Sequence, residues 1–171
     1  LAVVDNGIYL GAVAENNLGA LFLVNEVFNK TKFPLVIAGS APSNELLDAV
    51  KKHAHITLKG DISTNEINSL IANAQINVLP TFQATGIKLK LLAALFSGRH
   101  CLVNNPMVAN TGLEELCILR DSAKEMAKEI ELLKNIPVSK SMIELRKHLL
   151  ENTFSNHFNA KLLMDFIQNT N

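Results

Sequence analysis

Residues 75–98 read QINVLPTFQATGIKLKLLAALFSG, and this stretch decides the fold. Its first part is an apolar run of strand length, and the pattern then changes to the apolar spacing of a helix over Gly86–Gly98. Lys88 and Lys90 stand at the start of that helix, where the partial positive charge of a helix N-terminus disfavours cations. Two lysines there indicate a bound anion, and phosphate is the leading candidate. The ordinary alternative is that lysines are common, solvated helix formers.

The composition indicates a globular protein and excludes several classes of partner. Of the 171 residues 48% are hydrophobic, and 16 basic side chains balance 16 acidic ones without a block of like charge. A broad electrostatic footprint for nucleic acid or for an anionic membrane is therefore missing. No apolar run is long enough to span a membrane, and no signal-peptide pattern opens the chain.

Two further features bear on the compartment and on the extent of the chain. Cys101 and Cys117 fall in apolar surroundings, where we expect buried, free thiols in strands. A cytoplasmic location fits this use of cysteine. The chain begins at Leu1 without an initiator methionine, which suggests a fragment of a longer protein.

Short apolar runs alternate with longer segments of helical period along most of the chain. This alternation predicts an α/β fold, a Rossmann-like parallel sheet of about six strands with helices on both faces and a helical C-terminal tail. We expect the domain over residues 1–136 and the tail over residues 137–171, where Pro137 breaks the chain. The expected strands are residues 8–11, 34–38, 55–58, 75–79, 99–103 and 116–119.

Several helix starts carry recognisable caps. Ser63 and Glu66 form the pattern of a capping box, in which a hydroxyl and a carboxylate satisfy free backbone donors. The polar stretch 104–112 contains Pro106 and Gly112, and we expect it to be irregular. The other expected caps are Asn16 or Asn17, Ser43 or Asn44, and Asp121 or Ser122.

The loops that follow the strands are the expected ligand-binding region. Open parallel sheets bind ligands at the carboxyl ends of their strands, because loops and helix N-termini converge there. A single glycine in such a loop often serves only the turn geometry, but together the loops outline a cleft. The segments concerned are residues 11–17, 39–43, 59–63 and 80–90.

The residues at these junctions form an ordered series along the chain. In sequence order they are Ile8–Gly11, Val36–Gly39, Thr57–Asp61, Glu66–Ile71, Ala74–Pro80, Gly86–Gly98 and Val103. Their order and spacing resemble the C-terminal half of a GT-B glycosyltransferase of group 1, also called family 4. The resemblance covers residues 8–134, and residues 153–155 are similar to part of the family's closing helix.

The resemblance implies a domain that holds a nucleotide-sugar donor and faces a separate N-terminal domain. It implies a hexosyltransferase in which Lys88 and Lys90 act as catalytic residues by stabilising the departing diphosphate. Residues 59–62 would lie near the base and Gly11 near the sugar or the phosphate. The full set of implied donor-binding residues is Gly11, Gly39, Lys59, Gly60, Asp61, Ile62, Thr85, Gly86 and Ile87.

Partners and cofactors follow from the same resemblance. The donor, a nucleotide-diphosphate sugar, is a substrate, so no cofactor and no metal ion is expected. The acceptor would be a glycan or a lipid-linked molecule held by the missing N-terminal domain, and any peripheral membrane contact would be made by that half. The isolated domain would then be inactive, and the process would be polysaccharide biosynthesis.

The two lysines are not equivalent in a helix. Residues two apart point to nearly opposite sides. Lys90 lies above Ala93 and Ser97, small residues that let a ligand approach. We therefore favour Lys90 as the phosphate contact, unless Lys88 precedes the first helical turn and folds over the loop.

The sequence departs from the family at two positions. The family carries a glutamate in the loop before the helix and a second one on the helix that binds the ribose, whereas these positions hold Thr85 and Ala93 here. No carboxylate occurs anywhere between Glu66 and Glu114. This loss motivates a second hypothesis, a non-catalytic module that kept the fold and acts in binding or regulation.

Other chemistries lack their motifs in this sequence. The five histidines are dispersed, and no pair has the i, i+4 spacing of helical metal ligands. No Gly-x-Ser-x-Gly turn, dinucleotide-binding glycine fingerprint or Gly-Lys-Ser/Thr loop is present. A phosphoacceptor receiver domain would need an acidic cluster, whereas Asp61 stands alone.

Overall fold

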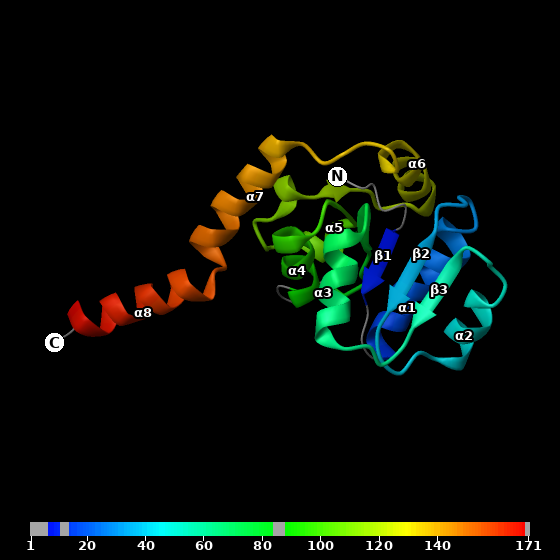
Figure 1. The fold of residues 1–171 in the computed structure, drawn as a ribbon, viewed down its shortest axis with the longest axis horizontal. Helices are drawn as coiled ribbons and strands as arrows, with labels where there is room; N and C mark the ends of the chain where they lie inside the picture. The colour runs from blue at the N-terminus through cyan, green and yellow to red at the C-terminus, as the bar shows by residue number, and fades with distance from the viewer. Residues whose placement is uncertain (1–6, 11–13, 84–87, 170–171) are drawn as a thin grey trace. The chain divides into compact units, whose positions relative to one another are not determined.

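The computed structural model describes residues 7–10, 14–83 and 88–169 of the chain. The chain divides into two compact units, Leu1–Pro137 and Val138–Asn171. The first unit contains all strands of the described residues, and the second contains two helices (Figure 1).

The strands of the first unit form a parallel sheet in the order β3-β2-β1-β4-β5-β6. Figure 1 shows β1, β2 and β3 side by side, and β1 joins β4 only through Gly7↔Ile76 and Ile8↔Asn77. The predicted α/β class with parallel strands and covering helices is therefore confirmed. The strands are β1 (Gly7–Leu10), β2 (Leu35–Ala38), β3 (Ile56–Lys59), β4 (Ile76–Leu79), β5 (His100–Val103) and β6 (Ile118–Leu119).

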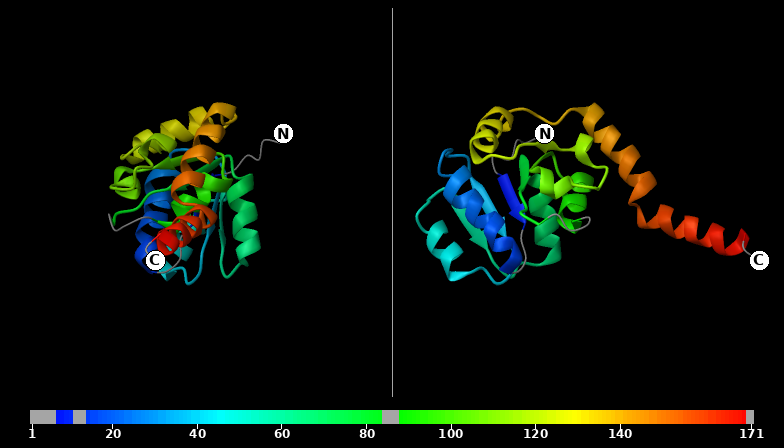
Figure 2. Two further views of the ribbon diagram at one scale, coloured as in Figure 1. Left: turned by 90° about the vertical axis from the view of Figure 1, so that its left-hand side faces the viewer. Right: turned by 180° about the vertical axis from the view of Figure 1, so that it is seen from behind.

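Helices lie on both faces of this sheet. The helix α3 lies in front of the strands in Figure 1, whereas α1 lies in front of β2 and β3 in the view from behind (Figure 2). The helices of the first unit are α1 (Ala14–Phe22), the π-helix η1 (Leu23–Val27), α2 (Asn44–Val50), α3 (Thr64–Asn73), α4 (Leu89–Ser97), α5 (Asn105–Val108), the 3-10 helix η2 (Glu114–Leu116) and α6 (Ala123–Leu133). The η1 segment and α6 share the main apolar cluster, and α3 packs against α4.

The apolar core lies directly against the sheet. Every residue of β4 and of β5 is buried, as is usual for strands covered on both faces. Phe28, Leu35, Ile76 and Leu102 are among the largest fully buried side chains. Burial of a side chain of this size contributes roughly 2 kcal/mol.

The helix starts follow the local signals in the sequence. Ser43 caps α2 by accepting a backbone N–H at 3.1 Å. The predicted capping box is confirmed, because the Ser63 hydroxyl accepts the Glu66 N–H and the Glu66 carboxylate accepts the Ser63 N–H at 2.9 Å. At α6 the cap is Ser122 and not Asp121.

Two local expectations are wrong. The helix α1 begins at Ala14, before both asparagines expected to cap it, and it continues into η1. The stretch 104–112 is not wholly irregular, since its start forms α5. Pro106 occupies an early position of α5, where its missing N–H has no helical partner to lose.

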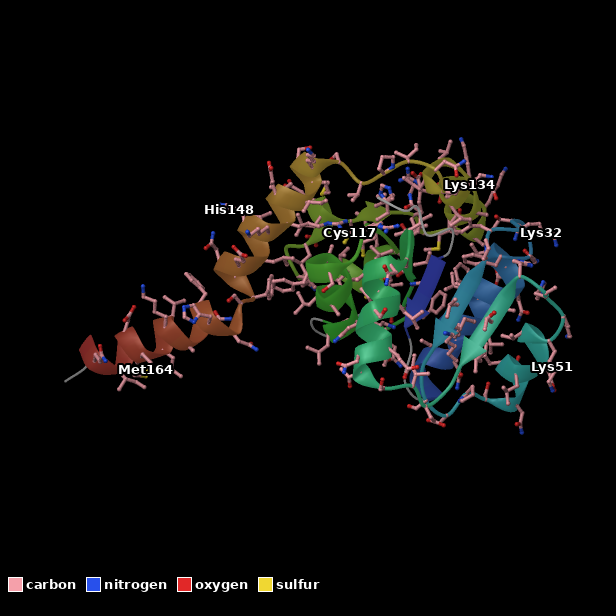
Figure 3. The ribbon with its side chains drawn as sticks, viewed as in Figure 1. Lys32, Lys51, Cys117, Lys134, His148 and Met164 are labelled. Carbon is pink, nitrogen blue, oxygen red and sulfur yellow. The ribbon has the colours of Figure 1, made fainter. Side chains whose placement is uncertain are left out.

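The two cysteines differ in their surroundings. Cys101 is buried in β5, as expected. Cys117, labelled in Figure 3, is half-buried and directly follows η2, so its expected place in a strand is wrong. Both are free thiols.

The second unit consists of α7 (Lys140–Thr153) and α8 (Asn156–Asn169). Ser139 caps α7 by accepting the Met142 N–H at 3.2 Å. The apolar side chains of α8 are exposed, among them Phe166 at 68% and Met164, which projects from the helix in Figure 3. No helix in the described part of the chain has both the length and the apolar character needed to cross a membrane.

Candidate functional site

The ends of β2 and β3 are joined through their backbones at the carboxyl edge of the sheet. The Gly39 N–H donates to the Lys59 carbonyl at 3.1 Å, which extends the pairing of the two strands by one step. The backbone of Gly60 also approaches Gly39, since a Cβ built on Gly60 would lie 3.9 Å from the Gly39 carbonyl oxygen. Three residues of the predicted donor site therefore lie together.

Two residues in these adjacent loops have left-handed backbones without being glycine. Ala41 has a φ of 49° and Asp61 a φ of 50°. Aspartate visits this region more readily than alanine, because its short polar side chain can bond locally. Such conformations are retained where the surroundings hold them, and they concentrate at ligand sites.

The loop after β2 is also tied to α1. The Asn17 side-chain oxygen accepts the Ser43 N–H at 3.4 Å, and the Ser43 hydroxyl in turn caps α2. Asn17 thus connects two of the predicted ligand-binding segments. The local sequence indicates a helix cap for this asparagine, because its observed partner is 26 positions away in the chain.

A second asparagine, which the sequence analysis missed, holds the loop after β4. The Asn104 side-chain oxygen accepts the Thr81 N–H at 2.9 Å, and its amide nitrogen donates to the Thr81 carbonyl at 2.7 Å. Both residues are buried. The sequence signal for this contact was a polar residue directly after the buried strand β5. An asparagine side chain can hydrogen-bond to a backbone N–H and carbonyl in the way that a neighbouring strand does.

The start of α4 differs from the expectation in one respect that matters for the site. Lys88 does not lie in the first turn: it is the N-cap residue, with an extended backbone at φ −91° and ψ 121°. Its carbonyl accepts the N–H of Leu91 at 2.9 Å, and no side chain caps the helix. The alternative in which Lys88 precedes the first helical turn is therefore the one observed.

Lys90 lies in the first turn of α4 and is half-buried, as is Lys88. Burial, and secondarily the nearby positive charge of Lys88, lower the pKa of Lys90 to about 8. An ammonium group in such a place is more stable when an anion is beside it. The first turn of α4 contains no acidic residue.

The remaining predicted site residues vary in exposure. Lys59, Gly60 and Asp61 are exposed and Ile62 is half-buried. Gly11, Thr85, Gly86 and Ile87 lie outside the described residues. Within the described ranges no three His, Cys, Asp or Glu side chains are grouped so as to hold a metal ion.

Large apolar side chains are exposed on segments at this same edge. Leu18 of α1 is 61% exposed, Phe82 in the loop after β4 is 53% exposed, and Leu89 at the start of α4 is 82% exposed. The Phe82 ring makes an edge contact with Phe22, with ring centroids 5.4 Å apart. Single exposed apolar side chains are common on soluble proteins, so these three do not by themselves identify a site.

Comparison with known proteins gives matches in fold but not in sequence. No protein-family model matches the chain, and no curated protein matches it significantly. AviGT4, a glycosyltransferase involved in avilamycin A biosynthesis, matches with a TM-score of 0.58 and 15% identity, over 83% of this chain and 45% of its own.

Two further solved structures match. The C-terminal domain of a group 1 glycosyl transferase family protein, LpcC from Francisella tularensis, gives a TM-score of 0.65 and 19% identity, covering 88% of this chain and 87% of that one. The UDP-GlcNAc 2-epimerase of Methanocaldococcus jannaschii, solved with UDP-GlcNAc and UDP, matches with a TM-score of 0.51 and 15% identity. The match covers 86% of this chain and 46% of the epimerase. The chain spans less than half the length of AviGT4 and most of the LpcC domain. It therefore has the fold of the C-terminal domain of a GT-B glycosyltransferase.

Proposed function

We propose that this chain is the donor-binding half of a hexosyltransferase, which moves a sugar from a nucleotide-diphosphate sugar to a glycan or lipid-linked acceptor. The observation that carries the proposal is the pair of half-buried lysines, Lys88 and Lys90, at the start of α4. Burial and the nearby Lys88 lower the pKa of Lys90, so an anion bound beside it would stabilise its charged form. The fold shared with glycosyltransferase C-terminal domains supports the same function.

The proposed role of the two lysines is electrostatic stabilisation of the leaving group. Negative charge develops on the diphosphate as its bond to the sugar breaks. Lys88 and Lys90 would stabilise that charge together with the partial positive charge of the α4 N-terminus. Removing one such contact in an enzyme typically lowers kcat by roughly 10²–10³.

The rest of the donor would lie along the carboxyl edge of the sheet. We propose that Gly39 and residues 59–62 contact the nucleoside, in agreement with the backbone contacts that join Gly39 to Lys59 and Gly60. Gly11 and residues 85–87 would contact the sugar and the phosphates. The donor carries its own leaving group, so we propose no further cofactor.

The acceptor would be supplied by another domain. This chain spans 45% of AviGT4, which leaves room in an enzyme of that length for a second domain. The chain alone would then bind the donor without turning it over. The epimerase match is compatible with donor binding by this chain, because that enzyme also acts on a nucleotide sugar.

The proposal is tested by calorimetric titration of the chain with UDP and GDP. We expect binding of at least one nucleotide, and a weaker affinity in Lys90→Ala and in Lys88→Ala. Lys128→Ala is the matched control, because Lys128 is an exposed lysine on α6. A folded chain that binds no nucleoside diphosphate at millimolar concentration would contradict the proposal.

A second candidate is a non-catalytic binding or regulatory module. It is favoured by Ala93, which is half-buried on α4 where the family it resembles has a carboxylate, and by the lack of any carboxylate between Glu66 and Glu114. A measurement of glycosyl transfer by the complete protein distinguishes the two candidate functions. Unchanged activity after replacement of both Lys88 and Lys90 would favour the module.

A further inference from the structure

We propose that Asp61 makes the nucleotide site selective for guanine over uracil. This inference rests on the proposed function and deepens it, because it assigns the base of the donor. It is carried by the place of Asp61 in the sheet, by its backbone and by its lack of a partner among the described residues.

The topology separates Asp61 from the lysines by a suitable length. Lys90 lies at the start of the helix that follows β4, whereas Asp61 follows the edge strand β3. In the sheet order, β2 and β1 lie between these two strands. Three strand spacings amount to about 14 Å, comparable to an extended nucleoside diphosphate. A diphosphate at α4 therefore brings the base towards Asp61.

The other direction along the sheet is less suitable for a nucleoside. Beyond β4 the edge is occupied by Asn104, which is buried and bonded to Thr81. Next to it, the Asn105 N–H donates to the Asp121 carboxylate at 2.8 Å. Because these contacts occupy the other side, the loops after β2 and β3 are the better place for the nucleoside to bind.

Asp61 has a defined backbone conformation and an available carboxylate. Its backbone is left-handed, with a φ of 50°. The preceding Gly60 lies near Gly39, since a Cβ built on Gly60 would be 3.9 Å from the Gly39 carbonyl oxygen. The side chain is exposed and makes no hydrogen bond or ion pair with any residue that the structure describes. A short side chain on a defined backbone loses little freedom when it binds a ligand.

Two other carboxylates on this edge are less suitable. Glu66 is engaged in the capping box with Ser63, which also lowers the pKa of Glu66. Glu45 lies in the first turn of α2, where its charge complements the N-terminus of that helix. Asp61 is therefore the carboxylate assigned to the base.

The hydrogen-bonding edges of the bases explain the preference. Guanine presents two adjacent donors, N1–H and N2–H, which match the two oxygens of one carboxylate in strong charge-assisted bonds. Uracil presents a single donor, N3–H, between two carbonyl oxygens. A carboxylate that approaches uracil gains one bond and meets at least one repulsive lone pair, so uracil is disfavoured.

Calorimetry of the chain with GDP and UDP tests the assignment. We expect GDP to bind at least about tenfold more tightly, which corresponds to 1.4 kcal/mol. Asp61→Asn tolerates the left-handed backbone but offers one donor and one acceptor, which suits either base equally, so the preference should largely disappear. Asp61→Gly also keeps this backbone accessible and should abolish the preference as well.

Two exposed carboxylates serve as matched controls. Asp48 pairs with Lys51, labelled in Figure 3, at 2.9 Å on α2. Asp48→Asn and Glu45→Gln should leave the ratio of GDP to UDP affinity unchanged. A ratio near one in the unmodified chain, or a ratio that Asp61→Asn does not move, overturns the role of Asp61 while the proposed function stands. No binding of either nucleotide overturns both.

Discussion

The side-chain amide of Asn104 forms two hydrogen bonds with the backbone of Thr81, accepting its N–H at 2.9 Å and donating to its carbonyl at 2.7 Å. Asn104 follows β5 and Thr81 follows β4, so these bonds continue the pairing of the two strands after the strands end. They fix the beginning of the segment that leads to Lys88. The loop after β4 is thus held by a residue 23 positions after Thr81 in the sequence.

Replacement of Asn104 by alanine should lower the free energy of unfolding by about 2–4 kcal/mol, because the buried N–H and carbonyl of Thr81 lose their partners. Urea denaturation measures this change. Asn68→Ala is the control, since Asn68 is exposed on α3, and it should change stability little. Equal effects of the two substitutions would contradict the role given to Asn104.

The affinity for a nucleoside diphosphate should fall roughly tenfold between pH 7 and pH 9, because one proton is linked to binding. Lys90, with a pKa of about 8, is largely charged at pH 7 and largely neutral at pH 9 in the free protein. At pH 9 the Lys90 amine must therefore take up a proton when the diphosphate binds, and this uptake lowers the affinity. Calorimetry at both pH values provides the measurement.

The matched variant for this pH dependence is Lys90→Arg. Arginine stays charged throughout the range, so the affinity of this variant should be almost constant between pH 7 and pH 9. A pH profile that is the same in both proteins would remove Lys90 as its source.

Lys90 should also make the unliganded protein more stable as the pH rises from 8 towards 10.5. The folded-state pKa is lowered to about 8 from an ordinary value of 10.5, so between these values the unfolded chain binds a proton that the folded chain has lost. The cost of burying the charge is fully present below pH 8 and is relieved progressively as the pH rises from 8 to 10.5. In Lys90→Met this part of the pH dependence should disappear from the denaturation midpoints.

Gly98 and Gly60 should respond very differently to alanine. A Cβ on Gly98 would lie 2.4 Å from the Asn77 amide nitrogen and 2.6 Å from the Ala94 carbonyl, so Gly98→Ala should cost about 1–3 kcal/mol. A Cβ on Gly60 would meet only the Gly39 carbonyl at 3.9 Å, an ordinary contact. Gly60→Ala should therefore change stability by less than about 0.5 kcal/mol, and thermal unfolding of both variants checks the contrast.

Part of the candidate site could be predicted from the sequence because its signals are local. The capping box of Ser63 and Glu66 joins residues three apart, and Gly39, which ends β2, directly follows an apolar run. The exact start of α4 could not be predicted. Whether Lys88 is a helical residue or a cap depends on one pair of backbone angles, which neighbouring residues do not determine.

The contacts between loops could not be predicted either. Asn17 looked like a helix cap but bonds to Ser43, and Asn104 looked like part of an irregular stretch but bonds to Thr81. An asparagine carries one donor and one acceptor that suit many backbone partners. Its choice depends on which loops the sheet order brings together.

The sequence by itself determined the α/β class, the approximate strands and the caps of α2, α3 and α6, because apolar periodicity and capping act between residues that are close in the chain. Only the tertiary structure decided that Lys90 is half-buried beside Lys88 and that Asp61 stands at the end of an edge strand. Burial and charge depend on neighbours brought from distant parts of the chain. The strand order β3-β2-β1-β4-β5-β6, which places those neighbours, is a property of the whole fold.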